Sequence, residues 1–351
     1  MVVADVLRRI GHEIPGEAGI VIQKACEDVR TASGIAFLAV IAVILGIFAG
    51  YQYFGISRDY PNYVEFFELV RGSDGLIGVD TRFEFGFTAL VYMLVSLGLS
   101  NVAIYGTICA ICIMLKGVAI RTSELSLGLI AVLVFFYLSR YYILFEMTVL
   151  RASIAFAIAF YVFWRKDKRE LKLGEILLLC LAVSFHYSAI VLLAVYVLGR
   201  FNFKLASLVV FGIFFVGFVL RDLLFAEFQA IFPVLGTYLD VQASTTIVPL
   251  PFMLDIALIG AALGLRRHND VTMQYALIGM MLSVAIHFSM LEFPIVAARF
   301  RELLSVFVLI YVLKAFTSES RVVQLLAVVF AVGSGMLNLY AMTVYDPLLL
   351  G

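Results

Sequence analysis

The sequence predicts an all-α, polytopic integral membrane protein with about 11–12 transmembrane or re-entrant helices. Hydrophobic residues make up 63% of the 351 positions and charged residues only 14%, whereas about a quarter of the residues in a soluble domain are charged. The apolar residues also form continuous blocks, and about 20 mostly apolar residues cross a hydrocarbon core about 30 Å thick. The block 34–56 has that length and contains no charged residue.

Each apolar block is interpreted as a helix, because backbone polar groups must be paired within lipid. The segments run over 34–56, 84–99, 102–120, 125–145, 147–164, 173–185, 187–199, 205–220, 249–265, 272–290, 299–316 and 322–344. We expect residues 1–33 to form a short cytoplasmic amphipathic segment and 34–351 a single transmembrane domain. Two polar connections, 57–82 and 221–248, are longer than the others.

The distribution of Lys and Arg predicts the orientation, because basic residues are enriched in cytoplasmic loops. The run 165–172 holds five basic residues and is the strongest cytoplasmic marker, followed by Arg266-Arg267 and the stretch 314–321. The connection 57–82 has three Arg against five acids, and 221–248 has one Arg against three acids. The sequence therefore predicts a cytoplasmic N-terminus and places these two loops outside.

The number of crossings between these markers constrains two regions. Between 172 and 221 the orientation is satisfied if 173–199 forms two short half-helices with His186 at an outward-facing tip. Between 82 and 165 the number of crossings must be odd, yet four apolar segments lie there. One of 84–99 and 102–120 is therefore expected to be re-entrant or to lie flat, and the sequence leaves open which.

Charged residues inside apolar segments are candidates for function, because a charge at mid-helix costs about 2.5–3.5 kcal/mol on insertion scales. Glu146 and Arg151 are five positions apart, hence about 140° apart on a helix, and are not a ready pair. Arg151 needs another anionic partner. A ligand phosphate suits its guanidinium fork, and pairing within the protein is the alternative. Glu146 is a candidate for substrate binding with the same alternative.

Three further residues interrupt apolar sequence. His186, in the run Phe185-His186-Tyr187, is either a core residue or a general base or hydrogen-bond donor. Arg299 and Arg301 begin a span at its outer end. Arg299 is a second candidate for phosphate binding, whereas Arg301 is also compatible with an interfacial position.

The first outer connection combines aromatic and acidic residues. Asp59, Tyr60 and Tyr63 lie beside Arg58, and Glu84 opens the next apolar segment. Such a mixture suits a sugar, whose ring faces stack on aromatic rings and whose hydroxyl groups need acceptors. It equally suits the aromatic belt of a membrane interface. Asp59 and Glu84 are candidate catalytic residues, and Arg58, Tyr60 and Tyr63 are candidates for substrate binding.

The sequence lacks the motifs that several kinds of enzyme chemistry require. It has no Walker loop, no helix with paired zinc-binding histidines, and no aspartate pair that would hold a metal-bound sugar nucleotide. We therefore expect no metal or other cofactor. Cys109 and Cys112 lie in an apolar helical run and are interpreted as packing residues. The net charge is zero, which indicates no nucleic-acid partner.

A set of these short motifs, in this order and spacing, resembles the EpsG-like branch of the Wzy-type polysaccharide polymerases. The resemblance covers about 57–200 and resumes near 297–316. Its motifs are Asp59-Tyr60 with Tyr63, Glu84-Phe85-Gly86-Phe87, Leu150-Arg151 with Ile154-Ala155, the basic turn 165–172, Phe185-His186-Tyr187-Ser188-Ala189, and Ala298-Arg299-Phe300. The sequence departs from the family at Ala152, where Gln is frequent, and at Phe85, where Pro is frequent.

The resemblance implies a glycosyltransferase of GT-C-like architecture in the bacterial inner membrane. Such enzymes join oligosaccharide repeat units that are linked to undecaprenyl diphosphate, on the outer side of the membrane. By this resemblance Arg151 and Arg299 would stabilise the leaving diphosphate. His186 would be the first choice for the base, with Glu84 or Asp59 second. A chain-length regulator and a flippase of the same pathway are further candidate partners, beside the lipid bilayer.

Two alternatives stay open from the sequence. A ligase of the O-antigen type is expected to have a larger outer loop than 221–248. A non-enzymatic flippase or other transporter of lipid-linked oligosaccharides is expected to show internal symmetry in its hydropathy, which the sequence does not display.

Overall fold

The computed structural model describes residues 17–79, 81, 83–120, 125–220, 249–265, 270–291, 293–345 and 347–350. Within these residues it is all-α apart from one short strand pair, as predicted. The α-helices are α2 (Glu17–Gly50), α3 (Tyr60–Arg71), α4 (Phe85–Ser96), α5 (Asn101–Ile120), α6 (Leu127–Tyr137), α7 (Leu150–Trp164), α8 (Leu173–Phe185), α9 (Ile190–Leu198), α10 (Phe203–Val219), α12 (Leu250–Gly264), α13 (Val271–Ser289), α14 (Pro294–Leu304), α15 (Val306–Phe316) and α16 (Arg321–Tyr340).

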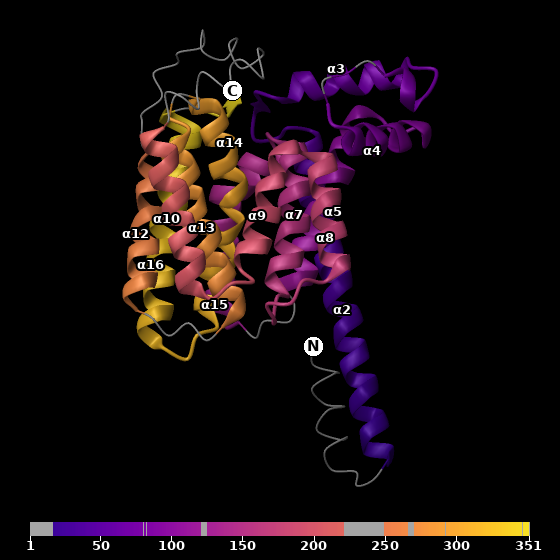
Figure 1. Ribbon diagram of the computed structural model, residues 1–351. Helices are drawn as coiled ribbons and strands as arrows, with labels where there is room; N and C mark the ends of the chain where they lie inside the picture. Colours follow the sequence, from indigo (N-terminus) through magenta and orange to yellow (C-terminus); the bar gives the residue numbers. More distant parts are fainter. Residues whose placement is uncertain are drawn as a thin grey trace.

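Most of these helices stand side by side and form a bundle (Figure 1). Among the described residues, five helical segments are long and apolar enough to cross a membrane. They are Ala32–Gly50, Asn101–Ile120, Leu127–Glu146, Val271–Ser289 and Arg321–Val344. The structure therefore confirms a polytopic membrane protein. The predicted outer connection 221–248 and the basic residues 266–268 lie outside the described residues.

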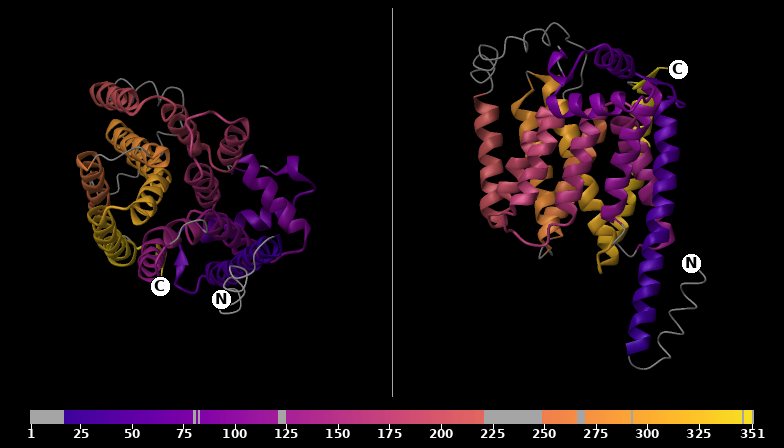
Figure 2. Two further views of the ribbon diagram at one scale, coloured as in Figure 1. Left: turned by 90° about the horizontal axis from the view of Figure 1, so that it is seen from below. Right: turned by 90° about the vertical axis from the view of Figure 1, so that its right-hand side faces the viewer.

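Helices α3 and α4 lie across one end of the bundle and project beside it, as Figures 1 and 2 show. The segment 84–99 is therefore the one that lies flat, and α5 is a full span packed along α2. Because α4 lies flat, the number of crossings between 82 and 165 is odd, as the sequence analysis requires. From α4 the chain crosses three times before the basic run 165–172, through α5, through α6 with its π-helical extension η2 (Leu138–Glu146), and through α7.

Helices α8 and α9 form the predicted pair of short helices. The backbone N–H of Lys172, the residue before α8, donates to the Tyr196 hydroxyl near the end of α9 at 2.9 Å. The start of α8 and the end of α9 therefore meet at the end of the bundle opposite to His186. The short 3-10 helix η3 (Tyr187–Ala189) joins α8 to α9, so His186 lies at the tip of the hairpin as predicted.

Three features differ from the predicted segments. Helix α2 begins at Glu17 instead of 34, and the 34 residues of α2 span about 51 Å, more than a bilayer core needs. The connection 57–82 contains α3, whose buried Tyr63, Phe66, Phe67 and Val70 follow helical spacing. Polar residues between these positions obscure that spacing in the sequence, which therefore predicts a loop here.

The third difference lies near the C-terminus. The predicted span 299–316 is two helices, α14 and α15, which meet at Ser305. In addition, β1 (Ile56–Ser57) pairs antiparallel with β2 (Leu349–Leu350), which ties the start of the first connection to the end of the chain. Two residues per strand are too short to give a periodic signal in the sequence.

Glycines allow α2 and α5 to pack closely. A Cβ atom on Gly46 would lie 2.5 Å from the Gly106 carbonyl oxygen, and one on Gly106 would lie 2.8 Å from the Gly46 carbonyl oxygen. Small residues at such interfaces let helix backbones approach within lipid, where association depends on packing. The close pairing of α2 and α5 therefore depends on these two glycines.

Replacement of Gly46 by Ala is expected to destabilise the protein by about 1–3 kcal/mol, because the added methyl group has no space against the α5 backbone. Thermal unfolding in detergent measures this. Gly212→Ala is the matched control, because a Cβ there has no other atom within 4 Å. Equal unfolding temperatures for the two variants would contradict the close packing.

Candidate functional site

The carboxylate of Glu84 joins three segments at the end of the bundle where α4 lies. Its Oε2 accepts a hydrogen bond from Arg151 Nη1 in an ion pair. Its Oε1 accepts from the backbone N–H of Tyr187 at 3.3 Å and lies 3.3 Å from His186 Nδ1. Glu84, Arg151 and His186 were all predicted as catalytic residues, and the structure brings them together.

The local backbone explains why these residues meet. Glu84 is the extended residue before α4, and α4 packs against α8 through Gly86. A Cβ on Gly86 would lie 2.7 Å from the carbonyl oxygen of Ser184, so only glycine permits this approach. His186 is also extended (φ −156°, ψ 109°) and ends α8. Its side chain is buried and is turned toward Glu84.

Arg151 lies in the first turn of α7 on a layer of aromatic rings. Its guanidinium carbon lies 4.6 Å from the centre of the Phe83 ring, a cation–π contact. Its backbone N–H donates to the Tyr63 hydroxyl at 3.4 Å, and Tyr63 in turn packs against Phe83 and Phe87. The side chain keeps 20% of its surface exposed, so it remains reachable from outside the protein.

Two polar atoms of this site lack a hydrogen-bond partner among the described residues. They are the buried Arg151 Nε and His186 Nδ1. The Nδ1 contact with Glu84 is close but is not aligned as a hydrogen bond. Buried polar groups are nearly always paired, so two unpaired atoms in one cluster indicate a place where a ligand or a proton completes the arrangement.

The environment of Glu84 determines the protonation state of its carboxyl group. Burial by itself would raise the pKa of this carboxyl group, but the adjacent His186 ring and the charge of Arg151 outweigh burial and lower the pKa to about 2. Glu84 precedes α4 and lies outside the membrane-spanning segments. The carboxylate is therefore ionised at neutral pH.

The other predicted residues of the first connection surround the aromatic layer. The Tyr60 ring lies 5.2 Å from that of Tyr105, and its hydroxyl donates to the Gly50 carbonyl at 3.2 Å. Asp59 precedes α3, and the backbone N–H of Arg58 donates to Leu348 at 3.1 Å. Tyr63 thus contacts Arg151, whereas the Tyr60 hydroxyl and the Arg58 backbone bond to Gly50 and Leu348.

Arg299 and Arg301 lie on α14, which packs against η3 and α7. Arg299 is exposed. The guanidinium of Arg301 lies 5.4 Å from the Phe252 ring centre on α12. The two side chains are about 200° apart around the helix, so they face different neighbours.

Glu146 occupies a separate, fully buried cluster. It forms an ion pair with Lys116 of α5 and accepts hydrogen bonds from Tyr137 at 2.8 Å and from Ser153 at 3.1 Å. Glu146 and Arg151 are therefore not paired with each other, as their spacing predicts. The anionic partner of Arg151 within the chain is Glu84, 67 positions away.

Three buried charges were missed by the sequence reasoning. Besides Lys116, they are Arg140 and Asp255, whose side chains form a bidentate pair at 2.8 and 2.6 Å, with Ser334 accepting from Arg140 at 2.7 Å. The signal was present, because each of the three interrupts an apolar segment, as Arg151 does. Their near-complete burial in closed pairs indicates a structural role.

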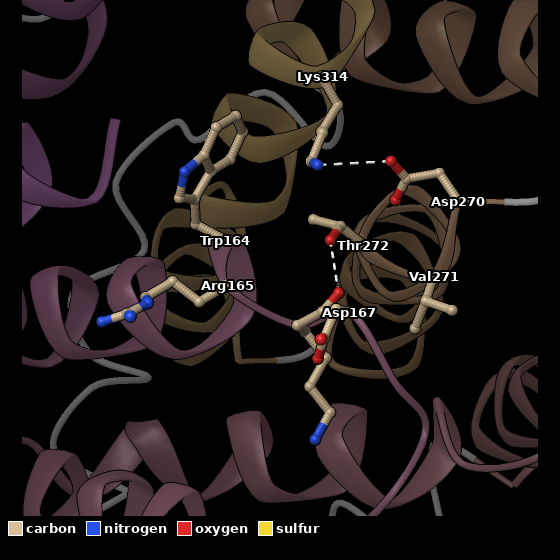
Figure 3. A pocket seen from close by; sticks show the side chains of 8 residues that line it. Trp164, Arg165, Asp167, Asp270, Val271, Thr272 and Lys314 are labelled. Carbon is tan, nitrogen blue, oxygen red and sulfur yellow. Dashed lines mark hydrogen bonds and ion pairs between the residues drawn. The ribbon is translucent and has the colours of Figure 1, made fainter. Parts of the chain in front are cut away.

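A cavity of about 340 Å³ lies at the opposite end of α7, lined by Trp164, Arg165, Lys166, Asp167, Asp270, Val271, Thr272 and Lys314 (Figure 3). Lys314 lies 3.4 Å from Asp270, and Lys166 pairs with Glu175. In Figure 3 Arg165 points away from Lys314 and Asp270. Both ammonium groups are thus occupied by carboxylates, which distinguishes this cavity from the Glu84 group.

The pKa of Glu84 predicts a pH dependence of stability. Its pKa in the folded protein lies below the ordinary value of 4.5, so its contribution is complete above about pH 4.5 and is lost as the pH falls toward 2. Glu84→Gln should remove this part of the acid dependence. Unfolding temperatures in detergent between pH 7 and pH 3 test this, with the exposed Glu65→Gln as control. Parallel curves for the wild type and Glu84→Gln would contradict it.

Searches of curated proteins and of solved structures return no match for the chain. A model of the EpsG family matches residues 35–349, which include the whole Glu84 group and every described helix except the part of α2 before residue 35. The chain therefore belongs to the EpsG family, which is linked to exopolysaccharide biosynthesis.

Proposed function

We propose that this protein is a polysaccharide polymerase. It joins oligosaccharide repeat units carried on undecaprenyl diphosphate, at the outer side of a bacterial cytoplasmic membrane. The observation that carries the proposal is the group formed by Arg151, Glu84 and His186 at one end of the membrane bundle. It combines a cation for a diphosphate with a carboxylate–imidazole pair for a hydroxyl proton, and membership of the EpsG family supports the substrate class.

Arg151 suits the diphosphate of the donor. Its guanidinium is partly exposed, and its Nε has no partner among the described residues, so it keeps donors for a second acceptor beside Glu84. A guanidinium binds phosphate oxygens through parallel hydrogen bonds. Negative charge accumulates on the diphosphate as it leaves, and a fixed cation at a partly dry site stabilises that charge. Arg299 on the neighbouring α14 is the proposed second contact.

His186 suits the role of general base. Glu84 faces its Nδ1, which favours a proton on that nitrogen and leaves Nε2 to accept another. This arrangement resembles the way a carboxylate orients the imidazole of a hydrolase triad. Glu84 is less suited to be the base itself, because both its oxygens already accept hydrogen bonds. Asp59 remains the second candidate.

The proposed step is a displacement at the anomeric carbon of the growing glycan. A hydroxyl oxygen on the terminal sugar of the acceptor unit forms the new bond to that carbon. The bond from the same carbon to the diphosphate oxygen breaks, and undecaprenyl diphosphate leaves with the electron pair. The hydroxyl proton passes to His186. The charges balance, and no cofactor or metal takes part in the step.

The Arg151 proposal is tested with purified protein and a lipid-linked repeat unit. The wild type should give a ladder of longer glycans, and Arg151→Lys should reduce the rate about 100-fold or more, because the charge stays but the fork is lost. Arg71→Ala is the matched control, since Arg71 is an exposed arginine at the same end that pairs with Glu68. Full activity of Arg151→Lys would remove Arg151 from the site.

The side of the membrane is tested by thiol labelling in a cysteine-free background. Tyr187 is exposed, so Tyr187→Cys should react with an impermeant maleimide applied to the outer side of intact cells. Lys168→Cys, in the basic run, should react only after the membrane is opened. The reverse pattern would place the Glu84 group in the cytoplasm.

A further inference from the structure

The flat helix α4 carries an exposed apolar stripe. Phe85, Met93 and Leu97 keep 68%, 52% and 69% of their surface exposed, and the small Ala89 lies between the first two. These residues are spaced by four, so they lie along one side of the helix. Helix α4 contains no charged residue, although it projects from the bundle.

The opposite side of α4 is buried. Phe87, Thr88, Val91 and Leu94 are the buried residues of the helix, which packs against α3 and α8. On α3, by contrast, most exposed side chains are polar, including Asn62, Glu65 and Glu68. The two helices together form a layer with one polar and one apolar surface, which is the distribution of a segment that lies in a membrane interface.

The position of this layer in the molecule also agrees with the level of a membrane interface. Figures 1 and 2 show α3 and α4 projecting beside one end of the bundle helices. At the same end, three of the four turn residues that follow α2 are exposed aromatics, namely Tyr51, Tyr53 and Phe54. Exposed aromatics of this kind mark the level of the membrane surface. An exposed apolar stripe at this level is suited to face hydrocarbon.

We propose that the stripe of Phe85, Met93 and Leu97 holds the polyprenyl chain of the lipid diphosphate whose phosphates bind Arg151. This inference rests on the proposed function and adds to it a binding surface for the lipid. The stripe begins at Phe85, next to Glu84, which is paired with Arg151. It then leads away from the charged group for about 18 Å, at 1.5 Å per residue.

The stripe begins next to the residue that pairs with Arg151, and this adjacency favours a polyprenyl diphosphate over bulk lipid. An amphiphile with an anionic head and a long chain satisfies both features at once if it lies along α4 with its head at the N-terminal end. Transfer from surrounding lipid to the stripe gains little hydrophobic free energy, because both are apolar. The proposed effect of the stripe is therefore steric. Its bulky side chains, separated by Ala89, position the polyprenyl chain and hence the diphosphate.

The test is photocrosslinking of the full-length protein in nanodiscs. A benzophenone amino acid replaces Met93 in one variant and Met336 in another. Met336 is exposed to a similar degree on α16, away from the site, and serves as the control. The probe is a fluorescent undecaprenyl diphosphate carrying one repeat unit. Unlabelled undecaprenyl diphosphate and phosphatidylglycerol are the two competitors.

Labelling at 93 that exceeds labelling at 336, and that falls with undecaprenyl diphosphate but not with phosphatidylglycerol, supports the proposal. Equal labelling at both positions, no labelling at 93, or equal competition by phosphatidylglycerol overturns it. If the wild type still forms glycan ladders in that case, the proposed function stands without this surface. If the wild type forms no ladder, the proposed function fails, and the inference fails with it.

A kinetic arm gives an independent readout. Met93→Asn combined with Leu97→Asn should raise KM for the undecaprenyl-linked donor about tenfold with little change in kcat, because contacts shared by ground and transition states are lost. A water-soluble donor with a single isoprene unit should show no such change. Met336→Asn is the control for inserting an amide into an exposed apolar face. A fall in kcat that is equal for both donors would overturn the proposal.

Discussion

The charged contact between Glu84 and Arg151 organises the functional end of this protein. The carboxylate precedes α4, while its partners come from the start of α7 and from the tip of the α8–α9 hairpin, 67 and 103 positions further along the chain. At a partly dry site such a contact is strong, and an unpaired charge there would be costly. The pair therefore fixes the position of a helix that does not cross the membrane relative to two that belong to the bundle.

Exposure separates this pair from the other charges inside the bundle. The side chains of Lys116 and Arg140 keep only 3% and 7% of their surface exposed, and each has a carboxylate partner that is also buried. Such closed pairs contribute to a specific packing arrangement. Arg151 keeps 20% exposed and retains an unpaired Nε. A charge that is both held by the protein and open to its surroundings is the one suited to a ligand.

The sequence was sufficient to predict most of the bundle and part of the site. Long apolar segments predicted the spans, because a helix that crosses the hydrocarbon core must be mostly apolar along its length. The orientation of 84–99 was not predictable, since this segment is apolar whether it crosses or lies flat. The contact of Gly86 with Ser184, almost one hundred positions apart, fixes it. Arg151 was recognised as a buried cation in need of an anion, but the identity of Glu84 as that anion depends on the fold.

The buried pair between Lys116 and Glu146 constrains how the chain enters the membrane. During synthesis Lys116 emerges 30 residues before Glu146, so α5 reaches the bilayer with an ammonium group that has no counter-ion, and an unpaired charge within a span raises the free energy of insertion. That cost falls only when α6 and η2 follow and supply the carboxylate. Insertion of α5 together with α6 and η2 as a helical hairpin is accordingly favoured over insertion of α5 alone, because the hairpin carries its own counter-ion.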